Sequence, residues 1–283
     1  MPDLQVISIE RDGHVATVWL DRPEARNAMG PAFWDDLTAA MTDVSTDADV
    51  RAVVMAARGP HFSVGLDLKA MAGLLTGSDG RGQDRGVGDG PPSMAVRATA
   101  ARAGVKRLQR SISSVADCPK PVLAAIHGYC IGGGVDLVSA CDIRMASADA
   151  VFSVRETKVA IVADLGSLQR LPPIIGKGHL AELAYTGKDI GAARAKEIGL
   201  VNEVFADADA VVSATRAMAA EIASNSPLAV EGTKAVLTAG EGRSVADGLD
   251  YVAAWNAGFL QSDDLIEAMA AFMAKRPPEF RGR

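Results

Sequence analysis

The stretch 130–144, CIGGGVDLVSACDIR, places three consecutive glycines inside a strongly apolar segment. Glycine loses more backbone entropy on folding than any other residue, so a run of it inside a core needs a reason. A strand through IHGYCI, followed by a helix from VDLVSA, would aim free N–H groups at a ligand from the positive end of the helix. This pattern predicts an anion or oxyanion site, and a plain strand-to-helix turn without function is the alternative.

On either side of this stretch, strand and helix patterns alternate along the chain. LQVISIE and HVATVWL, joined by RDG, predict a β-hairpin, and VRAVVMAA predicts a buried parallel strand. The alternation continues to about residue 155, which is typical of an α/β fold, whereas residues 207–275 are almost wholly helical in pattern. We therefore expect an α/β core over residues 1–200 and a helical region over residues 201–283.

The composition excludes several classes of protein. With 283 residues, 48% apolar and 23% charged, the chain is typical of a globular protein, and its net charge of −6 argues against nucleic-acid or anionic-membrane binding. Three cysteines and four histidines lack the spacing of a disulfide framework or a metal site, so we predict no metal. The N-terminal residues have no signal-peptide pattern and no segment reads as a transmembrane helix, so we expect a cytoplasmic enzyme.

A polar segment interrupts the core pattern at residues 76–93, TGSDGRGQDRGVGDGPPS. It has almost no apolar side chains with which to bury surface, so we predict a loop there. The segment is either a plain surface insertion or a lid over an active site.

Three carboxylates follow the glycines: Asp136, Glu156 and Asp164. Asp164 lies among Ile161, Val162, Ala163 and Leu165, so it is either a helix cap or a buried acid with a raised pKa. A second glycine-containing turn, HFSVGLDL at residues 61–68, could supply another backbone N–H to the same oxygen as the first turn.

The motifs DRPEARNAM, HFSVGLDLKAM, AAIHGYCIGGGVDLVSACDIRMAS and LGSLQRLPPIIG together resemble the crotonase, or enoyl-CoA hydratase/isomerase, superfamily. The resemblance runs from about residue 5 to 280, and it is strongest to the Δ3,5-Δ2,4-dienoyl-CoA isomerases. It implies an α/β crotonase spiral of ββα units with a C-terminal helical region used for trimerisation. It also implies a homotrimer or homohexamer that acts on an acyl-CoA thioester in fatty-acid β-oxidation, with no cofactor besides the CoA of the substrate.

The resemblance assigns roles to particular residues. The amides of Leu66 and Gly133 match the oxyanion hole, Glu156 acts near C2 and Asp164 near C6, and Asp136 orients Glu156. We also predict substrate or CoA contacts for Arg26, Ser63, Gly65, Asp67, Leu68, Gly132, Phe272 and Lys275. Arg26, and Lys275 from a neighbouring subunit, are candidates because the CoA phosphates are negatively charged.

Three other functions stay open at this stage. An enoyl-CoA hydratase would use Asp136 and Glu156 to hold water, and a non-catalytic relative would only bind acyl-CoA or RNA. A serine hydrolase of related fold would need His127 and Ser139 to meet, although no motif places them together. The sequence departs from the isomerase pattern at Lys158 and Ala160, where an acidic residue and a glycine are expected.

Overall fold

The computed structural model describes residues 2–73 and 93–283. The predicted loop 76–93 therefore falls outside the described residues, except for Ser93. The strands are β1 (Ile7–Asp12), β2 (Val15–Leu20), β3 (Ala52–Ala57), β4 (Val122–Ile126), β5 (Tyr129–Ile131), β6 (Ile143–Ser147), β7 (Val151–Ser153), β8 (Ile190–Gly191) and β9 (Glu203–Phe205). The helices of the core are η1 (Pro23–Ala25), α1 (Pro31–Thr46), α3 (Met94–Ala116), α4 (Gly133–Ser139), η3 (Glu156–Val159), α5 (Ser167–Arg170), α6 (Pro172–Ile175), α7 (Lys177–Thr186), α8 (Ala192–Glu197) and α9 (Ala208–Ala223).

A six-stranded sheet in the order β1-β2-β3-β4-β6-β9 forms the centre of the core. The predicted hairpin is confirmed, because β1 pairs antiparallel with β2, and the predicted parallel strand β3 pairs with β2 and β4. A second sheet, in the order β5-β7-β8, lies beside it and carries the glycine turn at the end of β5. This arrangement confirms the predicted α/β fold.

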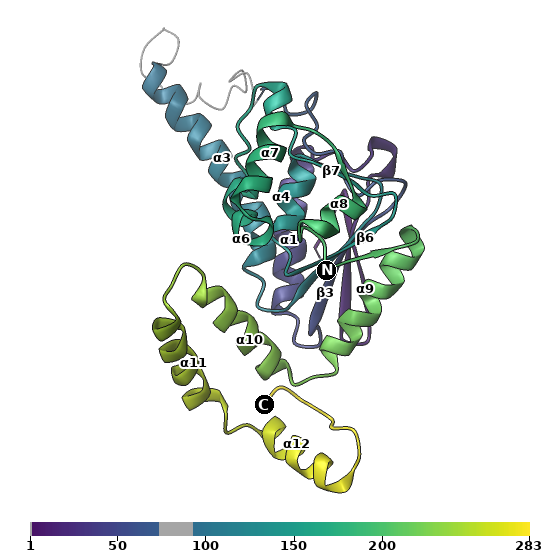
Figure 1. Ribbon diagram of the computed structural model, residues 1–283, viewed down its shortest axis with the longest axis vertical. Helices are drawn as coiled ribbons and strands as arrows, with labels where there is room; N and C mark the ends of the chain where they lie inside the picture. Colours follow the sequence, from purple (N-terminus) through teal and green to yellow (C-terminus); the bar gives the residue numbers. More distant parts are fainter. Residues whose placement is uncertain (1, 74–92) are drawn as a thin grey trace.

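Both faces of the large sheet are covered, which explains why its central strands are apolar throughout. Along β3, Val53 and Met55 join the core cluster that contains α1, while Val54 and Ala56 join the cluster beneath α9. This alternation follows from the two-residue repeat of a strand. Figure 1 shows α9 on one side of the sheet and α1, α3 and α4 on the other. Since β9 pairs with β6 and α9 packs on β3 and β4, the core continues past the predicted boundary at residue 200.

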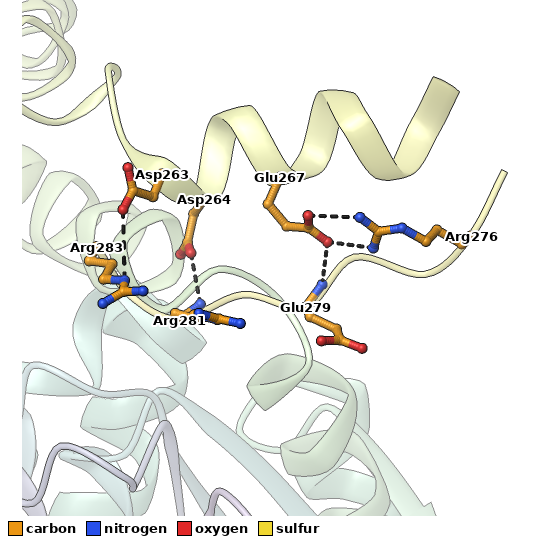
Figure 2. Close-up of a pocket in the computed structure, with 7 residues that line it drawn as sticks. All are labelled: Asp263, Asp264, Glu267, Arg276, Glu279, Arg281 and Arg283. Atoms are coloured by element: carbon orange, nitrogen blue, oxygen red, sulfur yellow. Dashed lines mark hydrogen bonds and ion pairs between the residues drawn. The ribbon is translucent and has the colours of Figure 1, made fainter. Parts of the chain in front are cut away.

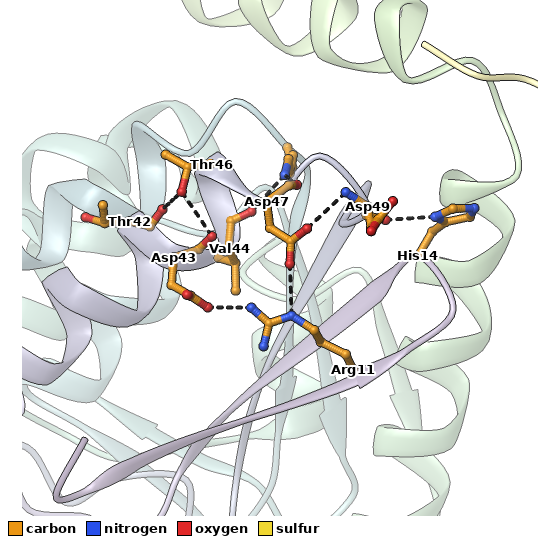
Figure 3. A network of polar contacts seen from close by, with 9 residues as sticks. Arg11, His14, Thr42, Asp43, Val44, Thr46, Asp47 and Asp49 are labelled. Atoms are coloured by element: carbon orange, nitrogen blue, oxygen red, sulfur yellow. Dashed lines mark hydrogen bonds and ion pairs between the residues drawn. The ribbon is translucent and has the colours of Figure 1, made fainter. Parts of the chain in front are cut away.

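A polar network ties the end of α1 to the β1–β2 hairpin (Figure 3). Arg11 on β1 pairs with Asp43 and, at 3.0 Å, with Asp47, which ends α1. Lys120, only 4% exposed, donates to the carbonyl oxygens of Val44 (2.8 Å) and Asp47. These contacts hold α1 against the sheet at the end opposite its proline start.

Helices α10 (Pro227–Gly240), α11 (Val245–Phe259) and α12 (Asp263–Ala274) extend away from the sheet as an arm, as Figure 1 shows. A serine caps each of them, because the hydroxyls of Ser226, Ser244 and Ser262 accept from N–H groups of the first turn. Buried Lys234 of α10 donates to the carbonyl of Lys120 (3.0 Å) and to Asp142 (2.7 Å). The arm is thus anchored where β4 begins.

The C-terminal tail, residues 275–283, runs back along α12 and is bonded to it (Figure 2). Buried Asp264 accepts from the N–H of Arg281 at 2.8 Å, and Glu267 pairs with Arg276 at 2.6 Å. Arg51 of the core donates to the carbonyl of Phe280 at 2.8 Å. Because its charged groups bond one another, the hollow between α12 and the tail reads as a structural joint.

Candidate active site

The glycine run forms the turn from β5 into α4. Gly132 has φ of 54°, a left-handed conformation that favours glycine, and its N–H donates to the carbonyl of Ser153 at 2.9 Å. A methyl group on Gly132 would lie 3.4 Å from Oε1 of Glu156, and one on Gly133 would lie 2.8 Å from the Met29 sulfur. The turn therefore needs glycines both for its conformation and for the close approach of a carboxylate.

The second turn, predicted at residues 61–68, lies directly against the first. Ser63 bridges to Cys130 and Leu66 bridges to Met29, so the two turns share neighbours. Gly65 has φ of 82°, and a methyl group there would lie 2.6 Å from the carbonyl oxygen of Ile131 and 3.2 Å from the nitrogen of Gly133. Any larger residue would push the two turns apart.

The N–H groups of Leu66 and Gly133 are adjacent and free. A methyl group on Gly133 would lie 3.9 Å from the nitrogen of Leu66, and neither amide donates to an acceptor within residues 2–73 and 93–283. Gly133 is also the first residue of α4, where the helix dipole favours negative charge. Two unpaired donors at one point form a site for an oxyanion.

Asp136 lies on the first turn of α4 and is 1% exposed. Its Oδ1 accepts from the N–H of Ser167 at 2.7 Å. Burial, with a smaller contribution from the charge of Asp164, raises the pKa of Asp136 to about 6, although hydrogen bonds from Ser167 and the charge of Arg170 oppose the rise. The hydroxyl of Ser167 is buried too and makes no well-directed hydrogen bond within the described chain, although it lies close enough to lower this pKa.

Glu156 begins η3 opposite the glycine turn. Its Oε2 is buried and has no hydrogen-bond partner among the described residues. Burial, then the charge of Asp136 and then that of Asp164, raise the pKa of Glu156 to about 7. The aliphatic chain of Lys158 packs near Gly187, and its charge lowers the pKa of Asp189. A carboxyl with a pKa near 7 and a free oxygen is suited to act as a general base.

Asp164 lies in the irregular segment between η3 and α5. It caps no helix, because α5 begins at Ser167 after Gly166 and has no side-chain cap. It is exposed in the single chain, so full burial is also wrong, but partial burial still raises the pKa of Asp164. Its charge raises the pKa of both Asp136 and Glu156, so the three carboxyls are close enough to interact electrostatically.

Two of the predicted binding residues, Ser63 and Asp67, also shape the second turn. Ser63 is fully buried, and its hydroxyl donates to the carbonyl of Asn27 at 2.8 Å and accepts from the N–H of Gly65 at 3.1 Å. Asp67 pairs with Arg22 at 3.1 Å. These contacts fix the shape of the turn, and contact of Ser63 and Asp67 with the substrate stays a prediction.

The other predicted binding residues fall into two places. Arg26 and Leu68 are exposed beside the turns, and the carbonyl of Arg26 accepts from the N–H of Val64. Phe272, 84% exposed, and Lys275 lie on the arm, away from the acids. The sequence analysis missed Ser167, whose only signal was its position three residues after Asp164.

The hydrolase alternative and a metal site find no support in the geometry. The Nε2 atom of His127 forms a hydrogen bond with the carbonyl oxygen of Gly59, and the hydroxyl of Ser139 donates to the carbonyl oxygen of Asp136. The two side chains therefore bond to different partners and not to each other. Among residues 2–73 and 93–283, no three histidine, cysteine, aspartate or glutamate side chains cluster as metal ligands. In the same ranges, every helix is too short or too polar to cross a membrane.

The spiral core, the paired amides and the surrounding carboxyls define an α/β protein of the crotonase type. The enoyl-CoA hydratase/isomerase family matches residues 10–85 and 93–283. The peroxisomal Δ3,5-Δ2,4-dienoyl-CoA isomerase of Arabidopsis thaliana is 42% identical over 277 residues, which cover 98% of this chain and 96% of that protein. The mitochondrial enzyme of the same name from Rattus norvegicus is 43% identical over 274 residues, covering 96% of this chain and 80% of that one.

A solved structure agrees with the sequence comparison. The crystal structure of enoyl-CoA hydratase from Bacillus anthracis has a TM-score of 0.86 and 32% identity, covering 99% of this chain and 100% of that one. The chain therefore belongs to the enoyl-CoA hydratase/isomerase family, as its motifs predicted.

Proposed function

We propose that the protein converts 3,5-dienoyl-CoA thioesters into 2,4-dienoyl-CoA thioesters in fatty-acid β-oxidation. Relatives at 42% and 43% identity over nearly the whole chain are named for that reaction. The observation that carries the proposal is a pair of adjacent unpaired amides beside Glu156, whose carboxyl interacts electrostatically with those of Asp136 and Asp164. A 1,5 proton shift needs a base at one carbon and an acid at another, with a place for negative charge between them.

In this mechanism Glu156 takes the proton from C2. The C2–H bond breaks and its electron pair enters the conjugated chain, so negative charge develops on the thioester oxygen. Asp164 then donates a proton to C6, and the double bonds move from positions 3 and 5 to positions 2 and 4. Solvent returns a proton to Asp164, which its exposure allows, and Glu156 releases the one it took.

The amides of Leu66 and Gly133 hold the thioester oxygen in this proposal. They are rigid before the substrate arrives, since each turn is fixed by its own hydrogen bonds. A preorganised donor of this kind contributes roughly 3–4 kcal/mol to stabilisation of the transition state.

Asp136 tunes Glu156 rather than touching the reacting carbons. The ionised Asp136 carboxylate raises the pKa of Glu156, which makes Glu156 a stronger base. The Ser167 N–H fixes the orientation of Asp136 at 2.7 Å.

We propose that the CoA part of the substrate contacts residues of two neighbouring chains. We assign Arg26 and Leu68 at the turns to CoA, while Gly65 and Gly132 provide the space beside the thioester. Phe272 and Lys275 would reach the site of a neighbouring chain through the arm, so we propose a homotrimer or homohexamer. The chemistry uses only carboxyls and amides, so we propose no resident cofactor and retain cytoplasm as the predicted compartment.

Enoyl-CoA hydratase is the second candidate. The pairing of Asp136 with Glu156 would serve to hold an attacking water, and the Bacillus anthracis structure carries that name. The third acid distinguishes the two reactions, since hydration at C3 has no use for Asp164.

A paired assay tests the proposal. Purified protein is given a 3,5-dienoyl-CoA and, separately, crotonyl-CoA, and ultraviolet absorbance follows each reaction. We expect the dienoyl substrate to be isomerised with the larger kcat/KM. Faster hydration of crotonyl-CoA would favour the hydratase instead.

A further inference from the structure

The backbone that carries Asp164 is almost free of its own hydrogen bonds. Residues 162–165 neither donate nor accept any backbone–backbone hydrogen bond within the described ranges. The last such bond before them runs from Ile161 to Glu156, and the first after them accepts at Gly166. A segment this loosely tied would let its acid wander unless side chains hold it.

Ala163 and Leu165 anchor the segment in the core, and two further side-chain contacts, both traced to α3, hold the backbone at Asp164 itself. Gln109 donates from Nε2 to the carbonyl oxygen of Asp164 at 2.6 Å. Arg170 donates to the carbonyl of Leu165 at 3.2 Å and is braced by the hydroxyl of Ser113 at 2.9 Å. Gln109 and Ser113 are four residues apart, so they lie on one face of the helix.

The platform behind these contacts is rigid. The same half of α3 buries Leu108, Ile112 and Val115, and the hydroxyl of buried Ser111 donates to the carbonyl of Trp34 at 2.8 Å. Arg170 also lies against Gly166, where any side chain would collide with its guanidinium. We call Gln109, Ser113 and Arg170 the clamp. Ser167, which neighbours Gly166, donates its N–H to Asp136, so the clamp links Asp164 to the other acids.

We propose that Gln109 and the Ser113–Arg170 pair are positioning residues that set where Asp164 meets the acyl chain. The inference rests on the proposed isomerase function and deepens it. A dienolate can accept a proton at C2, C4 or C6, so the product depends on where the acid is held. Held at C6, it gives the 2,4-dienoyl product, whereas delivery at C4 would leave double bonds at positions 2 and 5.

The test compares Gln109→Met combined with Ser113→Ala against the wild-type protein and against Ser114→Ala. Methionine keeps the size of Gln109 without its donor. Ser114 is the matched control, because it neighbours Ser113 on α3 but, among the described residues, its hydroxyl donates within its own helix, to the carbonyl of Ser111. Three quantities are measured: kcat for 3,5-dienoyl-CoA, exchange of the C2 proton with deuterated water, and the ratio of 2,4- to 2,5-dienoyl products.

For the double variant we expect a loss of about tenfold in kcat, which corresponds to roughly 1.4 kcal/mol. Exchange at C2 should stay within about twofold of wild type, and the 2,5-dienoyl share should rise, while Ser114→Ala changes none of these quantities. Unchanged kcat and product ratio would overturn the proposed role of the clamp. An equal loss of C2 exchange and of isomerisation would overturn it too, because it would show that the substitutions disrupt the whole site. A wild-type protein that isomerises no 3,5-dienoyl-CoA would instead refute the proposed function.

Discussion

At the scale of single residues, burial keeps the carboxyls of the site partly protonated at pH values at which they would be ionised in water. Burial raises the pKa of Glu156 to about 7 from its ordinary value of 4.5, and that of Asp136 to about 6. Ionising these acids therefore lowers the stability of the fold. Between the ordinary and the raised pKa of each acid, the folded state favours its protonated form.

Glu156→Gln should stabilise the protein at pH 7. Between about pH 4.5 and 7 the folded chain binds more protons at Glu156 than the unfolded chain, so wild-type stability falls as pH rises. The neutral amide removes this component, and we expect a gain of roughly 1–3 kcal/mol at pH 7 and little gain at pH 4. Urea unfolding at both pH values measures it. A variant less stable than wild type at pH 7 would contradict the assigned burial of the charge.

At the scale of elements, the ends of η3 and α4 decide the geometry of the acids. Local patterns were sufficient to predict the glycine turns, because a free amide beside a helix start has a sequence signature. They also predicted the hairpin, since its two apolar runs and its turn are adjacent. They did not predict that Asp164 is exposed, because its neighbours Ala163 and Leu165 point into the core while it points out.

The sheet pairing beyond residue 200 was not predicted, for a related reason. Strand β9 is only three residues long, and its pairing with β6 is a contact across almost sixty positions that no local pattern reports. Likewise Ser63 and Asp67 lie in the motif, yet their partners Asn27 and Arg22 come from a distant loop. No local pattern shows that these two side chains also bond to residues of another segment.

Ala160, which ends η3, offers a test of local strain. It has φ of 59°, a left-handed conformation that costs a residue with a β-carbon about 1 kcal/mol. Ala160→Gly should therefore stabilise the fold by about 0.5–1 kcal/mol. Ala217→Gly, at an exposed position inside α9, is the matched control and should destabilise by a similar amount. Thermal unfolding of both variants checks the signs, and a loss of stability in both would show that Ala160 is unstrained.

At the scale of the whole molecule, the arm exposes apolar surface that a single chain does not cover. Large apolar side chains lie open on it, among them Leu237, Ile266, Met269, Phe272 and Met273. Exposed apolar area of this extent is typical of a surface that another chain covers. The proposed assembly of three or six chains would bury it and bring Lys275 toward a neighbour's turns.

Replacing Phe272 and Met273 together by serine should weaken that assembly. These side chains are 84% and 75% exposed, so their loss removes little from the fold of one chain. We expect the molar mass in solution to fall toward that of one chain at micromolar concentration, as measured by sedimentation. Tyr185→Ser is the control, since that side chain is 81% exposed but lies on α7 of the core. An unchanged mass in the double variant would remove the arm from the interface.

The central claim is that Asp164 delivers the proton to the far end of the diene. The most direct measurement is kcat of Asp164→Asn with a 3,5-dienoyl-CoA, taken beside exchange of the C2 proton in deuterated water. Asparagine keeps the shape but has no acidic proton, so isomerisation should fall by about a hundredfold or more while Glu156 continues to exchange C2. Isomerisation at the wild-type rate would contradict the account and leave the hydratase as the better assignment.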